Sequence, residues 1–563
     1  MESLITTVKS VSEIISDFHF GNIAVPEIQR DVVWTSEQIK DLIDSISRGY
    51  PCGALIFWEP REKDQTLVKS MIRPERLELH DGALPRYFLL DGQQRITALA
   101  SVLLPRDEIK KILLEFEEEM PFFFANLKSF PSGTKQAKPP ELEATNDPAG
   151  YGFPWILFNK LFDSRFVTET DFSKLPTGSI ETIRTYVQRL RDYQFPVQII
   201  RDRDYSSVGE IFTRVNSAGT QLTGAEIHLA RIVPHWKGIT REFRDYRREL
   251  RKNNYDLDLT FLMRTITVIE CNVPQIKKLA DRISKDQPTR AHLNKLWKQS
   301  RGAIDGLIKI LRCGLSLDKS KFFMSKNALI PLVYSLAKVG TSRALERDVQ
   351  KFFLLSQISE HYSAAAETQL RRDFRQLTDS SQTAKDGLAE LVANVNQEAR
   401  QYFRGLKVQP KHVYGVASKN VLVLLIYIIM RKNEATDWGT GNRPTLDAIE
   451  PSDLQLHHIF PFDYMTKNKA LFQSYLDQGF TPADFRADVN DIANLTLISK
   501  SKNVEISDTP PSQYLLNETI PQMRKAHFIP ENQDLWKTEN FQQFLEERRR
   551  LMAVAMTKLL KRL

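Results

Sequence analysis

The sequence predicts a multidomain α+β protein, and three observations carry this prediction. The chain has 563 residues, a length that corresponds to roughly three or four domains at about 150 residues each. Short apolar, aromatic-rich strings alternate with helical patterns in the first part, and the middle part is almost wholly helical. A turn-rich stretch, Asn442–Gln455, precedes a last segment in which two strand-like strings return. We therefore predict domains over residues 1–235, 236–440 and 441–563.

Composition excludes several classes of protein. Hydrophobic residues make up 42% of the chain and charged residues 26%, which suffices for large cores and excludes a wholly disordered chain. The most apolar stretch, Val421–Met430, falls short of the ~20 residues that span a bilayer, so it predicts a buried core helix. The N-terminus lacks the pattern of a signal peptide, and three scattered cysteines suit a reducing compartment. We expect a cytoplasmic protein with no membrane partner, whose net charge of +8 favours polyanions.

Local patterns predict the elements of the first domain in order. Apolar residues at helical spacing predict a helix within Thr35–Gly49, with Thr35 or Ser36 as its N-cap. Pro131–Gly152 holds four prolines and three glycines and is predicted as a loop. Because a strand-like string follows it, we interpret this loop as an excursion from the domain. The other expected elements are strands at Ala54–Trp58, Arg86–Leu90 and Phe195–Ile200, a helix at Ile96–Leu104, and a helix–turn–helix over Ser207–Ile232.

Two basic segments are predicted as amphipathic helices. Arg241–Lys252 places Phe243, Tyr246 and Leu250 on one stripe among six basic residues. Basic residues interleaved with aromatic ones can follow a phosphate backbone, but a solvated basic face is the favoured interpretation. The C-terminal segment 546–563 is treated in the same way, first as a docking helix and second as a nucleic-acid contact.

The most informative string is LHHIFP, Leu456–Pro461, which is followed by DVNDIANLTLISKSKN, Asp488–Asn503. The paired histidines suit a strand end, Asn494–Ile498 has the composition of a second short strand, and a turn or short helix would then hold Asn503. Two surface histidines in a turn are the ordinary interpretation of the pair alone. The order and spacing of the later strings favour a catalytic site.

These strings resemble the HNH, or ββα-metal, nucleases. The resemblance implies that His457 binds a metal ion, that His458 is the general base, and that Asn494 orients the base through its backbone or side chain. Asn503 would be the last metal ligand, where many members carry histidine; an amide oxygen favours Mg²⁺ or Mn²⁺ over zinc. Hydrolysis of a phosphodiester needs such a cation on the developing charge and a base that takes a proton from water.

Two strings in the first domain are candidates for a second site: VPEIQRDVVW, Val25–Trp34, and LLDGQQRITAL, Leu89–Leu99. In the latter a strand meets a helix N-terminus across a glycine, a geometry that offers backbone N–H groups to a phosphate. Gly92 permits close approach, and Arg95 can form a charged fork with phosphate oxygens. Equally, Asp91 and Gln94 match a capping box, with Arg95 an ordinary surface side chain. The residues alone leave both interpretations open.

Together with IFTRVNSAGTQLTGAEI, residues 211–227, these strings resemble the N-terminal domain of GmrSD-type restriction endonucleases, a ParB/sulfiredoxin-like fold. That family joins this domain to an HNH domain in the same order, and the resemblance covers most of residues 10–230 and about 450–530. It implies nucleotide binding and hydrolysis and the sensing of modified DNA. Hydrolysis would not follow the P-loop mechanism, because no Walker A lysine loop occurs. The implied nucleotide-binding residues are Gln29, Arg30, Asp91, Gly92, Gln93, Gln94, Arg95, Asn216 and Gly219.

The resemblance thus implies a phage-defence enzyme, a metal-dependent endodeoxyribonuclease that cleaves modified foreign DNA. A nucleoside triphosphate (GTP, UTP or ATP) would regulate cutting, and the partners would be double-stranded DNA and a second copy of the chain. The modification, whether a glucosylated base, a methylated base or a phosphorothioate, is left open. The alternative is a nucleotide-regulated DNA-binding sensor with an inactive HNH fold, which the amide at Asn503 favours.

Overall fold

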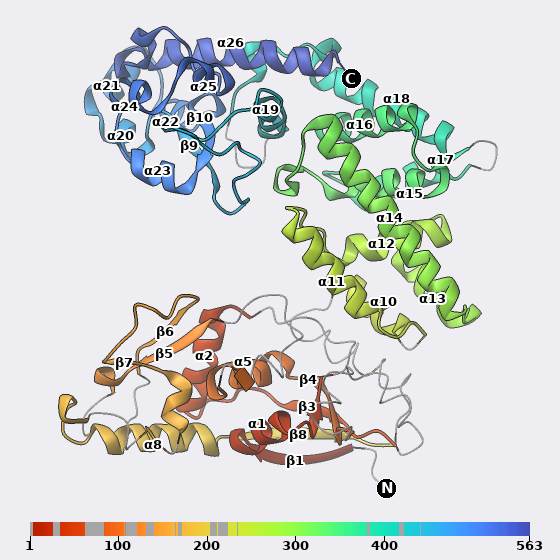
Figure 1. Ribbon diagram of the computed structural model, residues 1–563, viewed down its shortest axis with the longest axis vertical. Coiled ribbons are helices and arrows are strands. Elements are labelled where there is room, and N and C mark those ends of the chain that lie inside the picture. The colour runs from red at the N-terminus through yellow and green to blue at the C-terminus, as the bar shows by residue number, and fades with distance from the viewer. Residues whose placement is uncertain are drawn as a thin grey trace. The chain divides into compact units, whose positions relative to one another are not determined.

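The computed structural model describes the chain in two compact units (Figure 1), which comprise residues 1–244 with 283–287 and residues 245–282 with 288–563. The sequence-based domain boundaries stay a prediction. The described residues are 4–25, 34–61, 84–105, 107–108, 121–130, 140–163, 165–166, 172–202, 211, 223–233, 235–379, 383–415, 421–439 and 441–562.

A five-stranded mixed sheet organises the first unit, in the order β1-β8-β3-β4-β2. Strand β3 lies parallel to β8 and antiparallel to β4. The three predicted strands are present, each within one residue of its predicted ends, and β8 returns to this sheet after the loop segment. The strands are β1 Leu4–Ser10, β2 Ile23–Ala24, β3 Leu55–Trp58, β4 Tyr87–Asp91 and β8 Gln194–Ile200.

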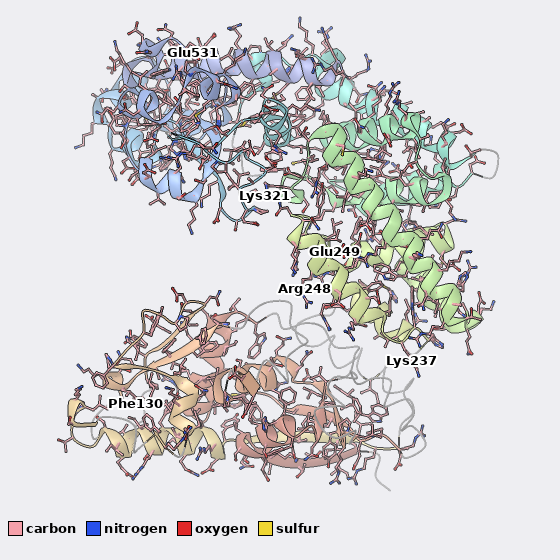
Figure 2. The ribbon with its side chains drawn as sticks, in the orientation of Figure 1. Phe130, Lys237, Arg248, Glu249, Lys321 and Glu531 are labelled. Carbon is pink, nitrogen blue, oxygen red and sulfur yellow. The ribbon has the colours of Figure 1, made fainter. Side chains whose placement is uncertain are left out.

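Four helices pack with this sheet around one apolar core. They are α1 Val11–His19, α2 Ser36–Ser47, α5 Gln93–Leu103 and α8 Ser179–Asp192. Helix α2 is the helix predicted after Thr35, whose hydroxyl accepts the Gln38 N–H in a capping box. Phe130, labelled in Figure 2, lies in this core with its ring edge-on to Tyr186. A further helix, α10 Gly224–Ile232, confirms the second half of the predicted helix–turn–helix; the first half falls largely outside the described residues.

The loop predicted over residues 131–152 is partly wrong. Leu142–Thr145 forms strand β6, which pairs with β5 Phe122–Asn126 in a small antiparallel sheet that β7 Trp155–Leu157 completes. The reason is the alternation within this strand: Leu142 and Ala144 pack against the core of the unit, as the two-residue period of a half-buried strand requires. The flanking prolines concealed this pattern.

Helices account for the regular elements of the middle of the chain, as predicted. In Arg241–Lys252, Phe243, Tyr246 and Leu250 are buried, which confirms the amphipathic interpretation, and all ten residues of Val421–Met430 are buried. Among the described residues, no helix combines the length and the apolar character needed to cross a membrane. The helices are α11 Ile239–Lys252, α12 Leu259–Cys271, α13 Ile276–Asp286, α14 Arg290–Leu315, α15 Leu329–Val339, α16 Arg343–Ile358, α17 Ala366–Leu377, α18 Ala384–Tyr402 and α19 Val421–Lys432.

A buried histidine joins three of these helices. His361 follows α16, and its Nδ1 lies 2.7 Å from Glu398 Oε2 of α18, while its Nε2 lies 3.2 Å from Asp373 Oδ2 of α17. Burial alone would lower the pKa of His361, but the hydrogen bonds and charges of Asp373 and Glu398 outweigh burial and raise it. Both ring nitrogens therefore donate, and the imidazolium ties the helices together.

We expect His361→Gln to remove a pH-dependent part of the stability. Because the folded pKa is raised above its ordinary value, the imidazolium stabilises the fold fully below about pH 6.5, and this contribution is lost as pH rises through the folded pKa. The melting temperature of the wild type should thus exceed that of the variant most at pH 6, with the difference shrinking towards pH 9. A difference that grows with pH would contradict the charged state.

The C-terminal part contains two strands among short helices. The predicted strands at the histidine pair and at Asn494–Ile498 are present as β9 Leu454–His458 and β10 Leu495–Ser499. Of the turn or short helix predicted at Asn503, the structure has the helix, α23 Lys500–Ile506. The final helix, α26 Phe541–Leu560, buries one face and is thus the docking helix expected. The remaining helices are α20 Phe462–Lys467, α21 Lys469–Asp477, α22 Pro482–Val489, α24 Pro511–Glu518 and α25 Pro521–Ala526.

Two lysines, one of them buried, connect the helical middle to strand β9. Lys319 Nζ donates to the Asp447 carbonyl at 3.0 Å, and its side chain is wholly buried. Lys321 Nζ, labelled in Figure 2, donates to the carbonyls of Pro451 and Leu454 at 2.6 and 2.7 Å. Together the two ammonium groups hold the backbone that leads into the histidine strand, so that this strand is fixed by residues more than 120 positions earlier.

Candidate active site

The histidine pair lies at the end of a two-stranded antiparallel ribbon. Strand β9 pairs with β10 in a register that places His457 opposite Thr496 and His458 opposite Leu495. Helix α23 follows β10 directly, capped by the Ser499 hydroxyl, which accepts the Lys502 N–H. This strand–strand–helix arrangement brings Asn503 to His457 across 46 positions of the chain.

His457 and Asn503, the predicted metal ligands, are in direct contact. His457 Nδ1 lies 2.7 Å from Asn503 Oδ1, and Asn503 Nδ2 donates to Gln455 Oε1 at 2.9 Å. On the other side of the ring, His457 Nε2 lies 3.3 Å from the Tyr514 hydroxyl. His457 is only 2% exposed, and burial lowers its pKa to about 4. The ring is therefore neutral at pH 7, the state in which an imidazole binds a metal ion.

His458, the predicted general base, is half-buried and oriented by Asn490. Its Nε2 lies 3.2 Å from Asn490 Oδ1, and Asn490 Nδ2 donates to the Arg486 carbonyl at 3.0 Å. The amide oxygen can only accept, so the ring proton of neutral His458 sits on Nε2 and Nδ1 carries the lone pair. Burial lowers the pKa of His458. The hydrogen bond to Asn490 raises this pKa, but burial has the larger effect. The ring is thus a free base at neutral pH.

Asn494 is wholly buried and holds the backbone that follows the histidines. Its Oδ1 accepts the Phe460 N–H at 2.9 Å, and its Nδ2 donates to the carbonyls of Phe460 and Val489. Its own carbonyl accepts the Ile459 N–H. Asn494 therefore acts on His458 through the main chain, whereas the hydrogen bond to the His458 ring comes from Asn490.

A buried guanidinium fixes the start of β10. Arg548 of α26 is wholly buried and donates to the carbonyls of Ala493, Leu495, His527 and Phe528. Burial lowers its pKa to about 9, so the group still carries its charge at neutral pH. Two of the four carbonyls flank Asn494, which places Arg548 directly behind the site.

In the first unit, the DGQQR string forms a tight turn from β4 into α5. Gly92 is the N-cap of α5 with φ of 97°, and a Cβ at this position would lie 2.3 Å from Leu55 Cδ2. Only glycine satisfies both conditions without strain. The N-cap is Gly92, and no side chain caps the helix. The prediction that Asp91 and Gln94 form a capping box is therefore wrong.

The side chains of this string bind to each other and to neighbouring loops. Arg95 donates through Nη2 to Asp91 Oδ2 at 3.0 Å and through Nη1 to the Cys52 carbonyl at 2.8 Å. Gln94 Oε1 accepts the backbone N–H of Trp34 at 3.2 Å, so the last residue of the VPEIQRDVVW string meets the DGQQR string. Gln93 and Gln94 are buried. The predicted residues Gln29, Arg30, Asn216 and Gly219 lie outside the described residues.

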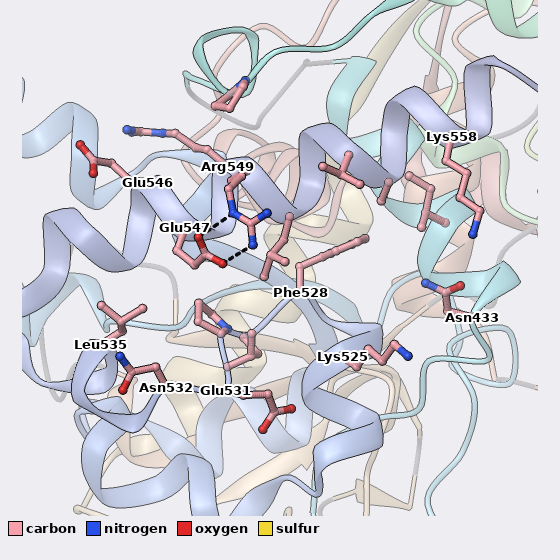
Figure 3. A pocket seen from close by; sticks show the side chains of 18 of the residues that line it. Asn433, Lys525, Phe528, Glu531, Asn532, Leu535, Glu546, Glu547, Arg549 and Lys558 are labelled. Carbon is pink, nitrogen blue, oxygen red and sulfur yellow. Dashed lines mark hydrogen bonds and ion pairs between the residues drawn. The ribbon is translucent and has the colours of Figure 1, made fainter.

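A groove of about 1830 Å³ lies along α19, α25 and α26 (Figure 3). Phe528 and Leu535 contribute to its apolar lining, and Lys525 and Lys558 are among its cations. On α26, Glu547 forms an ion pair with Arg550, three residues later in the same helix. None of the predicted site residues lines this groove, so it is separate from the histidine pair.

Sequence reasoning missed three residues of the histidine site: Gln455, Asn490 and Tyr514. Asn490 lies in the same string as Asn494, four positions earlier, and its proximity to a predicted catalytic asparagine was a usable signal. Tyr514 had no such signal, because it reaches His457 across 57 positions and through the packing of a separate helix.

Comparison with known proteins finds family matches in both the N-terminal and the C-terminal part of the chain. Residues 11–233 match the family described as "GmrSD restriction endonuclease, N-terminal domain". Residues 407–554 match the family described as "GmrSD restriction endonucleases, C-terminal domain". An uncharacterized protein of Methanocaldococcus jannaschii is 22% identical to the chain, in an alignment that covers 97% of each. The two matches include the DGQQR string and the histidine pair respectively.

Proposed function

The chain belongs to the GmrSD restriction endonuclease family, and from this premise we propose that it cuts modified DNA at the histidine pair with the help of a divalent cation. One observation carries the proposal. His457 and Asn503, predicted from separate strings, lie 2.7 Å apart at the end of one strand–strand–helix arrangement, and His458 is the next residue of the same strand. This is the arrangement expected of an HNH, or ββα-metal, site.

The contact between His457 and Asn503 fits a hard cation. Donor atoms at adjacent corners of an octahedral Mg²⁺ site lie about 2.9 Å apart, given bonds of ~2.0–2.1 Å. The observed separation of Nδ1 and Oδ1, 2.7 Å, is close to this value. Mg²⁺ or Mn²⁺ would thus have two protein donors and leave its other positions to water and phosphate, the mode that Mg²⁺ commonly uses.

Each residue of the site would then have a separate role in hydrolysis of the phosphodiester. The bound cation would stabilise the charge that develops on the scissile phosphate. His458, neutral at pH 7 and fixed by Asn490, would take the proton of the attacking water through Nδ1. Asn494 would keep the strand end rigid, so that base and phosphate stay aligned.

We further propose that the DGQQR turn binds a nucleoside triphosphate that regulates cutting. Gly92 gives a phosphate access to the first N–H groups of α5, an eleven-residue helix. Arg95 uses two N–H groups for Asp91 and Cys52, and a guanidinium has five, so it can also donate to a phosphate. This site would supply the discrimination that phosphate contacts at a nuclease site do not provide.

The deciding experiment is a cleavage assay with the full-length protein. Glucosylated, methylated and phosphorothioate DNA are compared with plain DNA, with and without Mg²⁺ or Mn²⁺ and with GTP, UTP or ATP. We expect cutting only with a divalent cation, preferentially on one modified DNA, and at a rate that changes with nucleotide. Binding of modified DNA without cutting in any condition would favour the alternative, a nucleotide-regulated sensor with an inactive HNH fold, which the amide at Asn503 motivates.

We expect Arg95→Gln to weaken nucleotide binding by about tenfold or more, because a charge-assisted hydrogen bond contributes ~1.5–3 kcal/mol. Calorimetric titration of the nucleotide measures this change. Arg86→Gln is a matched control, since Arg86 also belongs to this sheet region but pairs with Glu59 at the surface. A variant that binds nucleotide normally and only melts earlier would assign Arg95 to the fold alone.

A further inference from the structure

The buried face of His457 is closed by a tyrosine of helix α24. Tyr514 is 5% exposed, and its hydroxyl lies 3.3 Å from His457 Nε2 and donates to the Ile459 carbonyl at 2.8 Å. Trp438 packs edge-on against the same imidazole, with ring centroids 5.5 Å apart. The ring of His457 is therefore held from behind, and only Nδ1 faces Asn503.

The Tyr514 hydroxyl offers an acceptor to Nε2 of His457. A tyrosine hydroxyl has one proton, and here the shorter contact, to the Ile459 carbonyl, takes it. The oxygen of Tyr514 then presents lone pairs to His457 Nε2. To satisfy this contact, a neutral imidazole would carry its proton on Nε2, which leaves the lone pair on Nδ1.

The orientation of the Asn503 amide determines which of its atoms faces His457. Its NH₂ group donates to Gln455 Oε1, so its oxygen is the atom that faces His457. With the proton on Nε2, two acceptors, Nδ1 and Oδ1, point at each other across 2.7 Å. Two acceptors at this distance repel, so without a cation the ring carries its proton on Nδ1 and donates it to Oδ1, and a cation would have to take the place of that proton.

We propose that Tyr514 is a positioning residue: its oxygen is placed to accept a hydrogen bond from His457 Nε2, so that Nδ1 can give up its proton and bind a divalent cation together with Asn503 Oδ1. This inference rests on the proposed metal-dependent function and adds the residue that tunes the metal ligand. His457 and Asn503 would hold the cation, and the single proton of the neutral ring would then lie on Nε2 instead of Nδ1, a shift that water can mediate with no net release of a proton. Tyr514 accepts the hydrogen bond from the new Nε2–H.

The test is the affinity of the full-length protein for Mn²⁺, measured by electron paramagnetic resonance without DNA. Tyr514→Phe retains the ring but removes the acceptor, and we expect Mn²⁺ binding about 10- to 100-fold weaker, as for other residues that support a metal ligand. At saturating Mn²⁺ the nitrogen coupling from the His457 ring should persist, which separates a weakened site from a lost one. Tyr464→Phe is the matched control, because its hydroxyl contacts Thr538 instead, and its affinity should be unchanged.

His457→Ala tests the proposed metal site separately from the role of Tyr514. If His457→Ala leaves Mn²⁺ binding unchanged, the proposed metal site itself is wrong. If His457→Ala removes binding but Tyr514→Phe binds as tightly as the wild type, only the role of Tyr514 is overturned. Should Tyr514→Phe fail to fold, Tyr514→Met fills the same volume with a flexible side chain and is expected to show the same loss of affinity.

Discussion

Replacing His458 with alanine is expected to reduce DNA cleavage by about 10²- to 10⁴-fold, the contribution typical of a general base. The ring is half-buried, and Asn490 supplies its side-chain hydrogen bond, so its loss costs little stability. DNA binding and the melting temperature should therefore stay close to those of the wild type. Single-turnover cleavage of modified DNA measures the effect on the chemical step alone.

His527→Ala provides the contrasting variant. His527 is wholly buried in the same part of the chain, and it bonds to Thr496 and to the Thr436 carbonyl. Its removal should lower stability, yet the protein that stays folded should still cut. If His458→Ala cuts within about tenfold of the wild type, the assignment of the base is wrong.

Replacing Arg548 with methionine is expected to destabilise the second unit by roughly 3–5 kcal/mol. Methionine retains the apolar stem but leaves the carbonyls of four residues without their donor, each bond to a charged group being worth ~1.5–3 kcal/mol. Relief of the desolvated charge returns part of this loss. The melting transition of the unit should fall by at least about 5 °C, and DNA cleavage should be lost with it.

Arg550→Met, two residues further along the same helix, is the control for Arg548. Arg550 is exposed and pairs with Glu547 at the surface, and such pairs contribute ~0–1 kcal/mol. Equal melting temperatures for the two variants would contradict the role of Arg548 as a buried clamp.

Local patterns predicted the elements that carry the site. The strand at the histidine pair and the strand at Asn494–Ile498 were predicted, because short apolar strings bounded by turn residues favour strands; for Asn503 a turn or a short helix was expected, and the helix is present. The buried helix at Val421–Met430 followed from an unbroken apolar run too short to span a bilayer, and the amphipathic stripe of Arg241–Lys252 followed from periodicity. Their success shows that local and tertiary preferences agree in these segments.

The failures depend on tertiary structure. The strand at Leu142–Thr145 forms because its two apolar side chains find the core of the unit, which the surrounding prolines gave no reason to expect. The capping box at Asp91 is wrong because the turn needs a left-handed residue, and Gly92 takes the cap position instead. The contacts of Tyr514 and Asn490 with the histidines arise only when separate helices pack together, and no local pattern reports them.

The ammonium groups of Lys319 and Lys321 also constrain how such a chain evolves. A gene exchange that joins a new nuclease end near residue 440 would separate these lysines from the carbonyls of Asp447, Pro451 and Leu454. Lys319 would then be a buried cation without its carbonyl acceptor, which costs free energy, and Lys321 would lose both of its backbone acceptors. Recombination that preserves function must carry the lysines along, so the inherited unit begins well before the histidine strand.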